Sequence, residues 1–287
     1  MKLLLTGASG FIGSYFRNKY SKKHNIKSFS FLNDDLKNID LTHIDTVIHL
    51  SALVHQMGGA SKEEYERVNI AQTLELAKKA KENAVKHFIF MSTVKVYGEE
   101  ANIPYTEKSD CNPQDEYGKS KLKAELELQK LQDDDFKVSI IRTPIVYGYG
   151  VKGNIKSLIA LLNKVPILPF GDIENKRSMI YVGNLCHLIG TLIKKPKSDI
   201  FLACDDNTIS TKSLIELIAH ELNRKIYLIK IPFFKELLKL FKPSLYKRLY
   251  KSLEIDNTHT KEILGYRNLY TIEEGIKYTL KDENVLL

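Results

Sequence analysis

Short apolar runs alternate with longer amphipathic segments along the first half of the chain. The runs that predict strands are residues 2–5, 26–31, 46–50, 87–91 and 138–141. The segments with a helical spacing of apolar positions are residues 11–23, 62–83 and 117–134. Buried strands that alternate with helices of this length are typical of βαβ units. We therefore expect an α/β fold with a doubly wound parallel sheet that is covered by helices on both faces.

The second half departs from this alternation after Pro144, where glycines crowd residues 148–153. Residues 155–163 and 211–222 are predicted to be helices. The apolar segments 179–182 and 200–203 are predicted to return to the sheet.

A glycine-rich turn follows the first predicted strand and opens the first predicted helix, with the spacing GxxGxxG. A helix N-terminus in this position offers unpaired backbone N–H groups and a partial positive charge to a pyrophosphate. The turn therefore predicts a dinucleotide site, with NAD or NADP as cofactor. The residues that we expect to hold it are Gly7, Ser9, Gly10, Phe11, Ile12 and Gly13.

The second predicted strand lacks the residue that would choose between the two cofactors. An acid at its end binds the ribose of NAD, and an Arg there accepts the 2′-phosphate of NADP. Here the strand ends at Phe31, Leu32 and Asn33, while Asp34 and Asp35 follow a few positions later. The sequence leaves NAD and NADP open.

We expect the dinucleotide-binding domain over residues 1–150, with returns near 179–205. Residues 151–178 and 206–287 are expected to form a smaller C-terminal lobe that binds the substrate.

A Tyr and a Lys lie one helical turn apart in the segment Tyr117-Gly118-Lys119-Ser120-Lys121. A nearby ammonium favours the phenolate form, so Lys121 is expected to lower the pKa of Tyr117 and suit it to proton transfer. Thr93 follows a predicted strand, at the edge of the sheet where ligands bind, and can hydrogen-bond the same substrate oxygen. We therefore expect Thr93, Tyr117 and Lys121 to be the catalytic residues.

Together these features resemble the extended short-chain dehydrogenase family, which includes nucleotide-sugar epimerases, dehydratases and reductases. The resemblance spans roughly residues 1–195. It implies a Rossmann-type fold, an NAD or NADP cofactor, a UDP-sugar substrate, a homodimer and a cytoplasmic enzyme. The dimer would form through the helices at 62–83 and 117–134.

The resemblance also implies roles for individual residues, and it implies no metal ligand. The cofactor contacts that it adds are Asp35, Leu36, Leu50, Ser51, Ala52, Asn69, Ser92, Tyr117, Lys121, Pro144 and Val146. The substrate contacts that it implies are Thr93, Lys95, Asn154 and Arg177. A guanidinium suits the diphosphate because its planar fork binds phosphate oxygens in pairs.

Two details narrow the subfamily. Sugar 4,6-dehydratases carry Asp-Glu after the active-site Thr, and Val94-Lys95 stands here instead. The segments 49–57, 92–99 and 147–154 resemble bacterial UDP-sugar 4-epimerases or 4-keto-6-deoxy-N-acetylhexosamine reductases that make surface-polysaccharide precursors. We therefore expect NAD(P)-dependent redox chemistry at C4 of a UDP-linked hexose or N-acetylhexosamine. The alternative is a non-catalytic NAD(P)-binding sensor or scaffold.

The net charge of +8 allows nucleic acid, a membrane surface or an anionic ligand as partner. We expect no nucleic-acid binding, because the chain has no matching motif. Basic residues gather in the aromatic-rich segment 231–251. This segment is interpreted as a packed helical hairpin with a solvated basic face, as a peripheral membrane contact or as a basic rim for a diphosphate. Three scattered cysteines without a CxxC pair favour a reducing cytoplasm.

Overall fold

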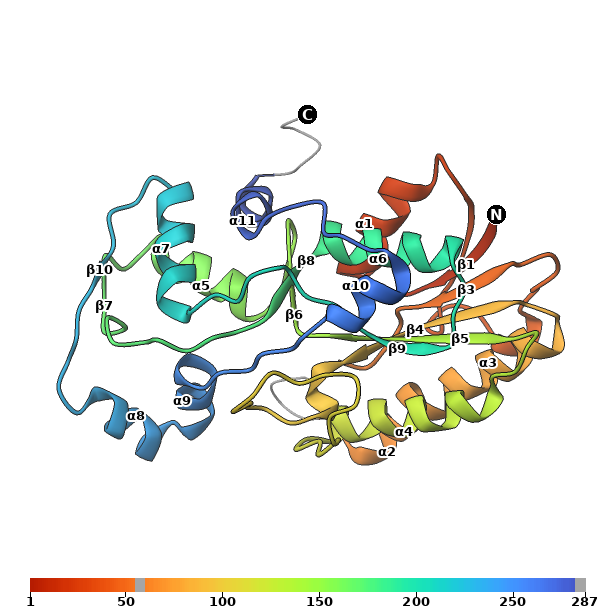
Figure 1. Ribbon diagram of the computed structural model, residues 1–287, viewed down its shortest axis with the longest axis horizontal. Coiled ribbons are helices and arrows are strands. Elements are labelled where there is room, and N and C mark those ends of the chain that lie inside the picture. The colour runs from red at the N-terminus through yellow and green to blue at the C-terminus, as the bar shows by residue number, and fades with distance from the viewer. Residues whose placement is uncertain (55–59, 282–287) are drawn as a thin grey trace.

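The computed structural model describes residues 1–54 and 60–281. At its centre lies a six-stranded sheet with the order β2-β1-β3-β4-β5-β9, in which every neighbouring pair is parallel (Figure 1). The strands are β1 (Lys2–Thr6), β2 (Asn25–Phe29), β3 (Thr46–His49), β4 (His87–Thr93), β5 (Lys137–Thr143) and β9 (Asp199–Leu202). The predicted parallel sheet is confirmed.

Helices cover both faces of this sheet, so the doubly wound architecture is also confirmed. On one face lie α1 (Phe11–Tyr20) and α6 (Val182–Lys194), which pack on a core that includes Leu3, Leu5 and Ile89. On the other face lie α3 (Gln72–Glu82) and α4 (Glu116–Leu131), over Leu4, Val47 and Phe88. Our sequence reading did not single out α6, because its apolar run continues directly from the preceding strand without a turn signal.

The remaining elements lie mostly after Pro144. Two short parallel pairs are formed by β6 (Ile145–Tyr147) with β8 (Met179–Tyr181) and by β7 (Ile167–Leu168) with β10 (Tyr227–Leu228). The helices there are α5 (Asn154–Leu162), α7 (Thr211–Glu221), α8 (Phe234–Phe241), α9 (Pro243–Tyr250), α10 (Thr258–Leu264) and α11 (Ile272–Leu280). Two single 3₁₀ turns, η1 (Leu36–Asn38) and η3 (Val94–Val96), follow β2 and β4.

One predicted return to the sheet is wrong. Residues 200–203 do join it, largely as β9, but 179–181 form β8, which pairs with β6 outside the main sheet. The physical reason is Pro144, which has no N–H to donate and therefore interrupts the strand between β5 and β6. The chain leaves the main sheet at this point, and β8 pairs with β6 instead of with the main sheet.

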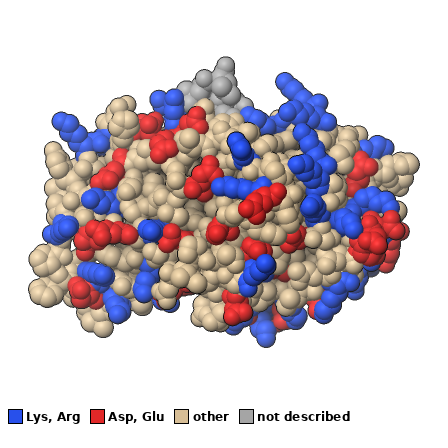
Figure 2. Space-filling model, in the orientation of Figure 1, with Lys and Arg blue, Asp and Glu red and all other residues tan. Residues whose placement is uncertain are grey.

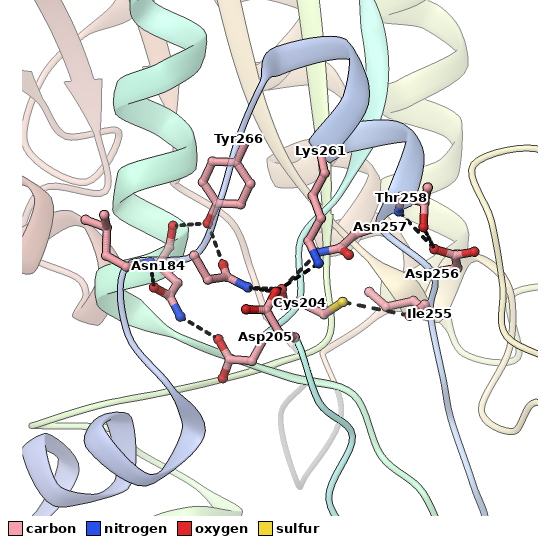
Figure 3. Close-up of polar contacts among 12 residues, drawn as sticks. Asn184, Cys204, Asp205, Ile255, Asp256, Asn257, Thr258, Lys261 and Tyr266 are labelled. Atoms are coloured by element: carbon pink, nitrogen blue, oxygen red, sulfur yellow. Dashed lines mark hydrogen bonds and ion pairs between the residues drawn. The ribbon is translucent and has the colours of Figure 1, made fainter.

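A buried carboxylate joins these outer elements to the core. Asp205 accepts hydrogen bonds from the Tyr147 hydroxyl (2.6 Å), the Asn184 amide (2.8 Å) and the Tyr181 backbone N–H (3.1 Å). Burial raises the pKa of Asp205 above its usual range. Figure 3 shows Asn184 between Asp205 and Tyr266, whose hydroxyl donates to the Asn184 carbonyl. The network fixes β6, β8 and α6 beside the carboxyl end of the sheet.

Two buried histidines make the stability of this fold depend on pH. Burial lowers the pKa of His49 and that of His87 to about 3, from an ordinary value of 6.5. Because the folded pKa lies below the unfolded one, the unfolded chain binds more protons below pH 6.5, and stability is lost as pH falls. We expect the free energy of unfolding to fall by up to about 1.4 kcal/mol per pH unit for each histidine between pH 6 and pH 5.

Urea unfolding at pH 7, 6 and 5 measures this slope. His87→Gln should remove about half of it, whereas His220→Gln, on an exposed side chain of α7, should keep it. A free energy of unfolding that does not change between pH 7 and pH 5 would contradict the burial of two neutral imidazoles.

Candidate active site

The turn between β1 and α1 has the shape of a phosphate cradle. Gly7 has φ = +69°, and a Cβ built there would lie 2.8 Å from the backbone nitrogen of Ser51. Only glycine therefore fits this turn. Gly10 is the N-cap of α1 and provides no side-chain cap, so the first backbone N–H groups of the helix can bind an anion. These residues fit a dinucleotide pyrophosphate.

The turn after β3 forms the wall opposite this cradle. The His49 imidazole, fully buried, hydrogen-bonds the Thr6 hydroxyl at 2.8 Å and the Thr73 hydroxyl at 2.9 Å. Thr6 also accepts a hydrogen bond from the Ser51 backbone N–H (3.2 Å). The histidine thereby ties the backbone of Ser51 to the first strand. Residues 55–57 of the segment 49–57 lie outside the described residues.

Asn69 connects this turn to the helix that carries Tyr117. Its side chain accepts from the Leu53 N–H (2.8 Å) and donates to the Leu53 carbonyl (2.9 Å) and to the Ser120 hydroxyl (3.0 Å). Ser120 in turn donates to the Tyr117 carbonyl at 2.8 Å. Asn69 is buried, and with these bonds it holds the two walls of the site at a fixed separation.

The sequence predicted one regular helix over 62–83, and the structure divides it into three parts. Between α2 (Lys62–Tyr65) and α3 lies η2 (Glu66–Ala71), a π-helical segment that contains Asn69. π-Helical turns in α-helices are frequent at functional sites because they reorient single side chains. Our reading of the sequence missed this segment, since apolar spacing does not distinguish one wider turn from a regular one.

The N-terminus of α4 places Tyr117 in the site. Asp115 caps the helix by accepting from the Gly118 N–H (2.7 Å), and it pairs with the Lys95 ammonium. A Cβ at Gly118 would lie 2.9 Å from the Lys95 carbonyl oxygen, so this glycine allows α4 to approach the end of β4. Sequence reasoning missed Gly118, although the glycine directly after Tyr117 was a visible signal.

Lys121 lies deeper in the same helix. Its ammonium donates to the Met91 carbonyl (2.8 Å) and lies 4.4 Å from the centre of the Phe90 ring. Burial lowers the pKa of Lys121 to about 7. Lys121 can therefore gain or lose its proton near neutral pH.

The expected lowering of the Tyr117 pKa is not found in the structure. Burial raises the pKa of Tyr117 well above its ordinary value, and the nearby Asp115 carboxylate and Tyr65 raise it further. The expectation is wrong for the protein alone, because desolvation of the buried phenolate is the largest cause of the shift and the neighbouring groups act in the same direction. Tyr117 holds its proton in this environment.

Most of the predicted site residues meet around one cavity of about 680 Å³. Those that line it are Ile12, Leu50, Ala52, Ser92, Thr93, Lys95, Tyr117, Lys121, Pro144, Val146, Asn154 and Arg177. Gly7, Ser9, Gly10, Phe11 and Gly13 form the adjoining cradle, where Ser51 contacts Gly7. The structure thus brings the two predicted sites, from distant parts of the sequence, together at the carboxyl end of the sheet.

Cationic side chains line the far part of this cavity. Besides the predicted Arg177 they include Lys152, Lys247 and Arg248, and Ser244 joins them from the same helix as the last two. The individual α9 residues were missed, although a basic rim from 231–251 was one interpretation of that segment. The helical hairpin expected there is formed by α8 and α9, which contact each other, but none of its residues is fully buried.

The end of β2 carries an acid that the sequence pattern did not place there. A turn folds the chain back, so that the Asp34 carboxylate accepts from the Ser30 N–H at 2.8 Å. An acid therefore does lie at the end of this strand. The neighbouring Asp35 accepts from the Lys37 N–H, and Leu36 is buried in the hydrophobic core, so neither lines the cavity.

The Ser92 hydroxyl donates to Glu125 of α4, although Ser92 also lines the cavity. The same carboxylate forms a buried ion pair with Arg142 (2.6 Å). Ser92 thus joins the end of β4 to α4 and β5.

The comparison with known proteins identifies the family. The profile of the NAD dependent epimerase/dehydratase family matches residues 3–203. The chain belongs to this family. UDP-glucose 4-epimerase from Vibrio cholerae is 36% identical over 307 residues, which cover 96% of this chain and 94% of that protein. The family resemblance expected from the sequence is therefore confirmed, and the cofactor of this family is NAD or NADP.

Two further relatives span most of the chain. N-acetyl-alpha-D-glucosaminyl-diphospho-ditrans,octacis-undecaprenol 4-epimerase from Escherichia coli O157:H7 is 28% identical and covers 80% of this chain and 75% of that protein. The structure of UDP-N-acetylglucosamine 4-epimerase from Methanobrevibacter ruminantium M1 has a TM-score of 0.81 at 23% identity, with 100% and 99% of the chains covered. This last likeness confirms the Rossmann-type fold.

Because Asn69 bridges the two walls of the site, its removal should lower both the stability of the protein and its turnover. Asn69→Ala leaves the Leu53 backbone groups without partners, which should lower the free energy of unfolding by about 1–3 kcal/mol. Turnover should fall more than dinucleotide affinity, because Tyr117 loses its support while the cradle stays intact. Urea unfolding, dinucleotide titration and steady-state kinetics measure the three effects. Thr191→Ala, which removes one helix-internal bond far from the site, is the control. Equal turnover in both variants would contradict the positioning role.

Proposed function

We propose that this protein is a 4-epimerase of a UDP-linked hexose or N-acetylhexosamine, with NAD(P)-dependent redox chemistry at C4. The observation that carries the proposal is the cavity that Thr93, Tyr117 and Lys121 line together with Ile12 of the dinucleotide cradle and with cationic side chains that include Arg177, Lys247 and Arg248. The 36% identity to a UDP-glucose 4-epimerase over nearly the whole chain supports the same reaction.

The proposed roles follow from the geometry of each side chain. Thr93 and Tyr117 hydrogen-bond the C4 oxygen of the sugar. Tyr117 acts in its phenolate form, which the positive charges of Lys121 and of a bound oxidised nicotinamide would favour. The phenolate takes the hydroxyl proton as the alcohol becomes a ketone, and the phenol returns it when the ketone is reduced. When bound, the nicotinamide supplies hydride transfer at C4. Lys121, held by the Met91 carbonyl, supplies the cation that favours the phenolate once the proton leaves.

The cationic part of the cavity suits the diphosphate of the substrate. Arg177 from the β8 side and Lys247 and Arg248 from α9 can bind phosphate oxygens, and charged hydrogen bonds of this kind are the strong ones. Asn154 and Lys95 are proposed to contact the sugar. We therefore propose residues 151–178 and 206–287 as the substrate lobe, with the dinucleotide domain over 1–150 and its returns near 179–205.

Removal of the phenol oxygen tests the catalytic role of Tyr117. Tyr117→Phe should lower turnover by about two to four orders of magnitude, the usual contribution of a positioned acid–base group. Dinucleotide affinity should stay close to that of the wild type, because the cradle is untouched. Tyr227→Phe, on an exposed side chain of β10, is the matched control. Turnover in Tyr117→Phe equal to that of the control would contradict the catalytic role of Tyr117, whereas a wild type without turnover would favour the non-catalytic sensor or scaffold.

Absorbance at 340 nm separates an epimerase from a reductase. With UDP-glucose or UDP-N-acetylglucosamine we expect conversion to the galacto isomer without net consumption of reduced cofactor. The sugar alcohol is oxidised at C4 and the resulting ketone is reduced again within one cycle, so no reduced cofactor is consumed overall. A stoichiometric fall in absorbance with UDP-4-keto-6-deoxy-N-acetylglucosamine and NADH or NADPH, with no isomerisation, would instead assign a 4-ketoreductase.

The Asp34 carboxylate predicts a preference for NAD over NADP. An acid at the end of β2 repels a 2′-phosphate and can accept hydrogen bonds from a free ribose hydroxyl. We expect Asp34→Ser to reduce the ratio of NADP to NAD dissociation constants by about tenfold, the effect of losing one such interaction. Fluorescence titration with both dinucleotides measures the ratio, and Asp35→Ser is the adjacent control. An unchanged ratio in Asp34→Ser would contradict this role.

A lipid-linked sugar diphosphate is the second candidate substrate. The relative from E. coli O157:H7 is named for a diphospho-undecaprenol sugar. The observation that favours it is the run of exposed apolar side chains on α8, next to the helix that supplies Lys247 and Arg248 to the cavity. Isomerisation of the undecaprenyl-linked sugar at a higher kcat/KM than the UDP-sugar would assign this substrate.

We also propose a homodimer through the helices predicted at 62–83 and 117–134, where Leu126 is an exposed apolar residue on α4. The three cysteines, Cys111, Cys186 and Cys204, are free, which supports a reducing cytoplasm as its compartment. Within the described residues, no helix has the length and apolar character needed to cross a membrane.

A further inference from the structure

The helix α8 presents an apolar face that the protein does not cover. Phe233, Leu237, Leu240 and Phe241 have exposed fractions of 77%, 52%, 74% and 72%. Leu237, Leu240 and Phe241 occupy positions i, i+3 and i+4, which lie on one side of a helix, and Phe233 is the N-cap residue at the start of α8. Exposed apolar patches of this kind mark interaction sites rather than ordinary protein surface.

The opposite side of α8 is the one that contacts the protein. Phe234 packs its ring against Phe170 at a centroid distance of 6.3 Å, and Leu238 lies one turn further along on the same side. Figure 1 shows α8 and α9 at the lower left edge, away from the central sheet. The exposed side chains Ile229, Ile231 and Leu245 extend the apolar surface on either side of α8.

Basic side chains accompany this surface. Residues 229–251 contain six Lys and one Arg but a single acid, Glu236. Lys239 and Lys242 are exposed and make no ion pair with another part of the chain that the structure describes. Figure 2 shows charged side chains between uncharged ones along this edge. A short helix with an apolar face and free lysines is typical of segments that lie in the interface of an anionic bilayer.

The lysines of α8 favour an anionic bilayer over an apolar protein surface as the partner. An apolar protein surface would bury the aromatic and leucine side chains but would leave the lysines without counter-charges. In an anionic bilayer the same helix can insert its apolar face below the headgroups, while the long lysine side chains extend back to the phosphates.

We propose that the hairpin of α8 and α9 is a docking surface for an anionic lipid bilayer. Leu240 and Phe241 enter the apolar boundary, and Lys239 and Lys242 contact the lipid phosphates. Because Ser244, Lys247 and Arg248 of α9 line the catalytic cavity, docking holds the cationic end of that cavity about one helix diameter, roughly 10 Å, from the lipid surface. The inference goes beyond the proposed function and holds whichever sugar diphosphate is the substrate.

Vesicle co-sedimentation of the full chain tests the apolar contact. With vesicles of phosphatidylglycerol and phosphatidylcholine, wild type should bind, and Leu240→Glu should lower the partition coefficient by about tenfold or more, as expected for one inserted leucine. Leu32→Glu makes the same change at a side chain that is 95% exposed after β2, and it should bind like wild type. Equal binding of Leu240→Glu and wild type would overturn the proposal.

The charge contribution has its own test. Lys239→Gln with Lys242→Gln should weaken binding by about tenfold or more, since each lysine near an anionic surface contributes about fivefold. The matched pair Lys22→Gln with Lys23→Gln, exposed after α1, should have no effect. Binding should also fall at high salt and on pure phosphatidylcholine vesicles. Equal binding to neutral and anionic vesicles would overturn the assignment to anionic lipid.

A second copy of the chain is the competing occupant of the same face. Sedimentation velocity without lipid distinguishes it, because Leu240→Glu should leave the mass of the particle unchanged if the face binds lipid. Loss of an oligomer in that variant, with no vesicle binding by wild type, would overturn the proposal. Turnover with a water-soluble UDP-sugar should be equal in wild type and Leu240→Glu, so failure of the proposed reaction and failure of docking are observed separately.

Discussion

The catalytic arrangement depends on the hydrogen bonds of Asn69. One amide side chain satisfies both backbone groups of Leu53 and the Ser120 hydroxyl, and so joins the turn after β3 to the helix that carries Tyr117. Because the Asn69 amide is buried, water cannot replace these hydrogen-bond partners. Any geometry that breaks the bonds would leave buried polar groups unpaired, which costs free energy. The π-helical turn in η2 directs the side chain to this position.

Burial sets the proton chemistry of the site. It raises the pKa of Tyr117, which keeps the phenol neutral, and it lowers the pKa of Lys121 to about 7, which brings the titration of the lysine close to neutral pH. A charged ligand that enters the cavity would shift both pKa values again, because a nearby cation or anion acts strongly on groups that are shielded from water. The protein contributes the positions of the two groups and their partial or full burial beside the cavity.

The α8–α9 hairpin has two faces with different roles. Lys247 and Arg248 line the cavity, while the apolar face of α8 lies outside the core. The pair buries none of its residues, but α9 is attached to the rest of the protein where the Thr211 hydroxyl donates to the Leu249 carbonyl and the Tyr250 hydroxyl donates to Asp172, both at 3.1 Å. The helix α9 therefore connects the cationic lining of the cavity with an exposed apolar surface.

The sequence by itself determined the features that depend on the spacing of residues close to one another along the chain. Alternating apolar runs determined the parallel sheet, the glycine spacing determined the turn before α1, and one helical turn between Tyr117 and Lys121 placed them on one face. Strand ends of a parallel sheet meet at one edge, so Thr93 could be assigned to the same site. Tertiary structure alone decided that Asp34 folds back to Ser30, that Leu36 enters the core and that α9 lines the cavity. It also decided that Tyr117 keeps its proton, because desolvation depends on every atom packed around a group and not on its neighbours in the chain.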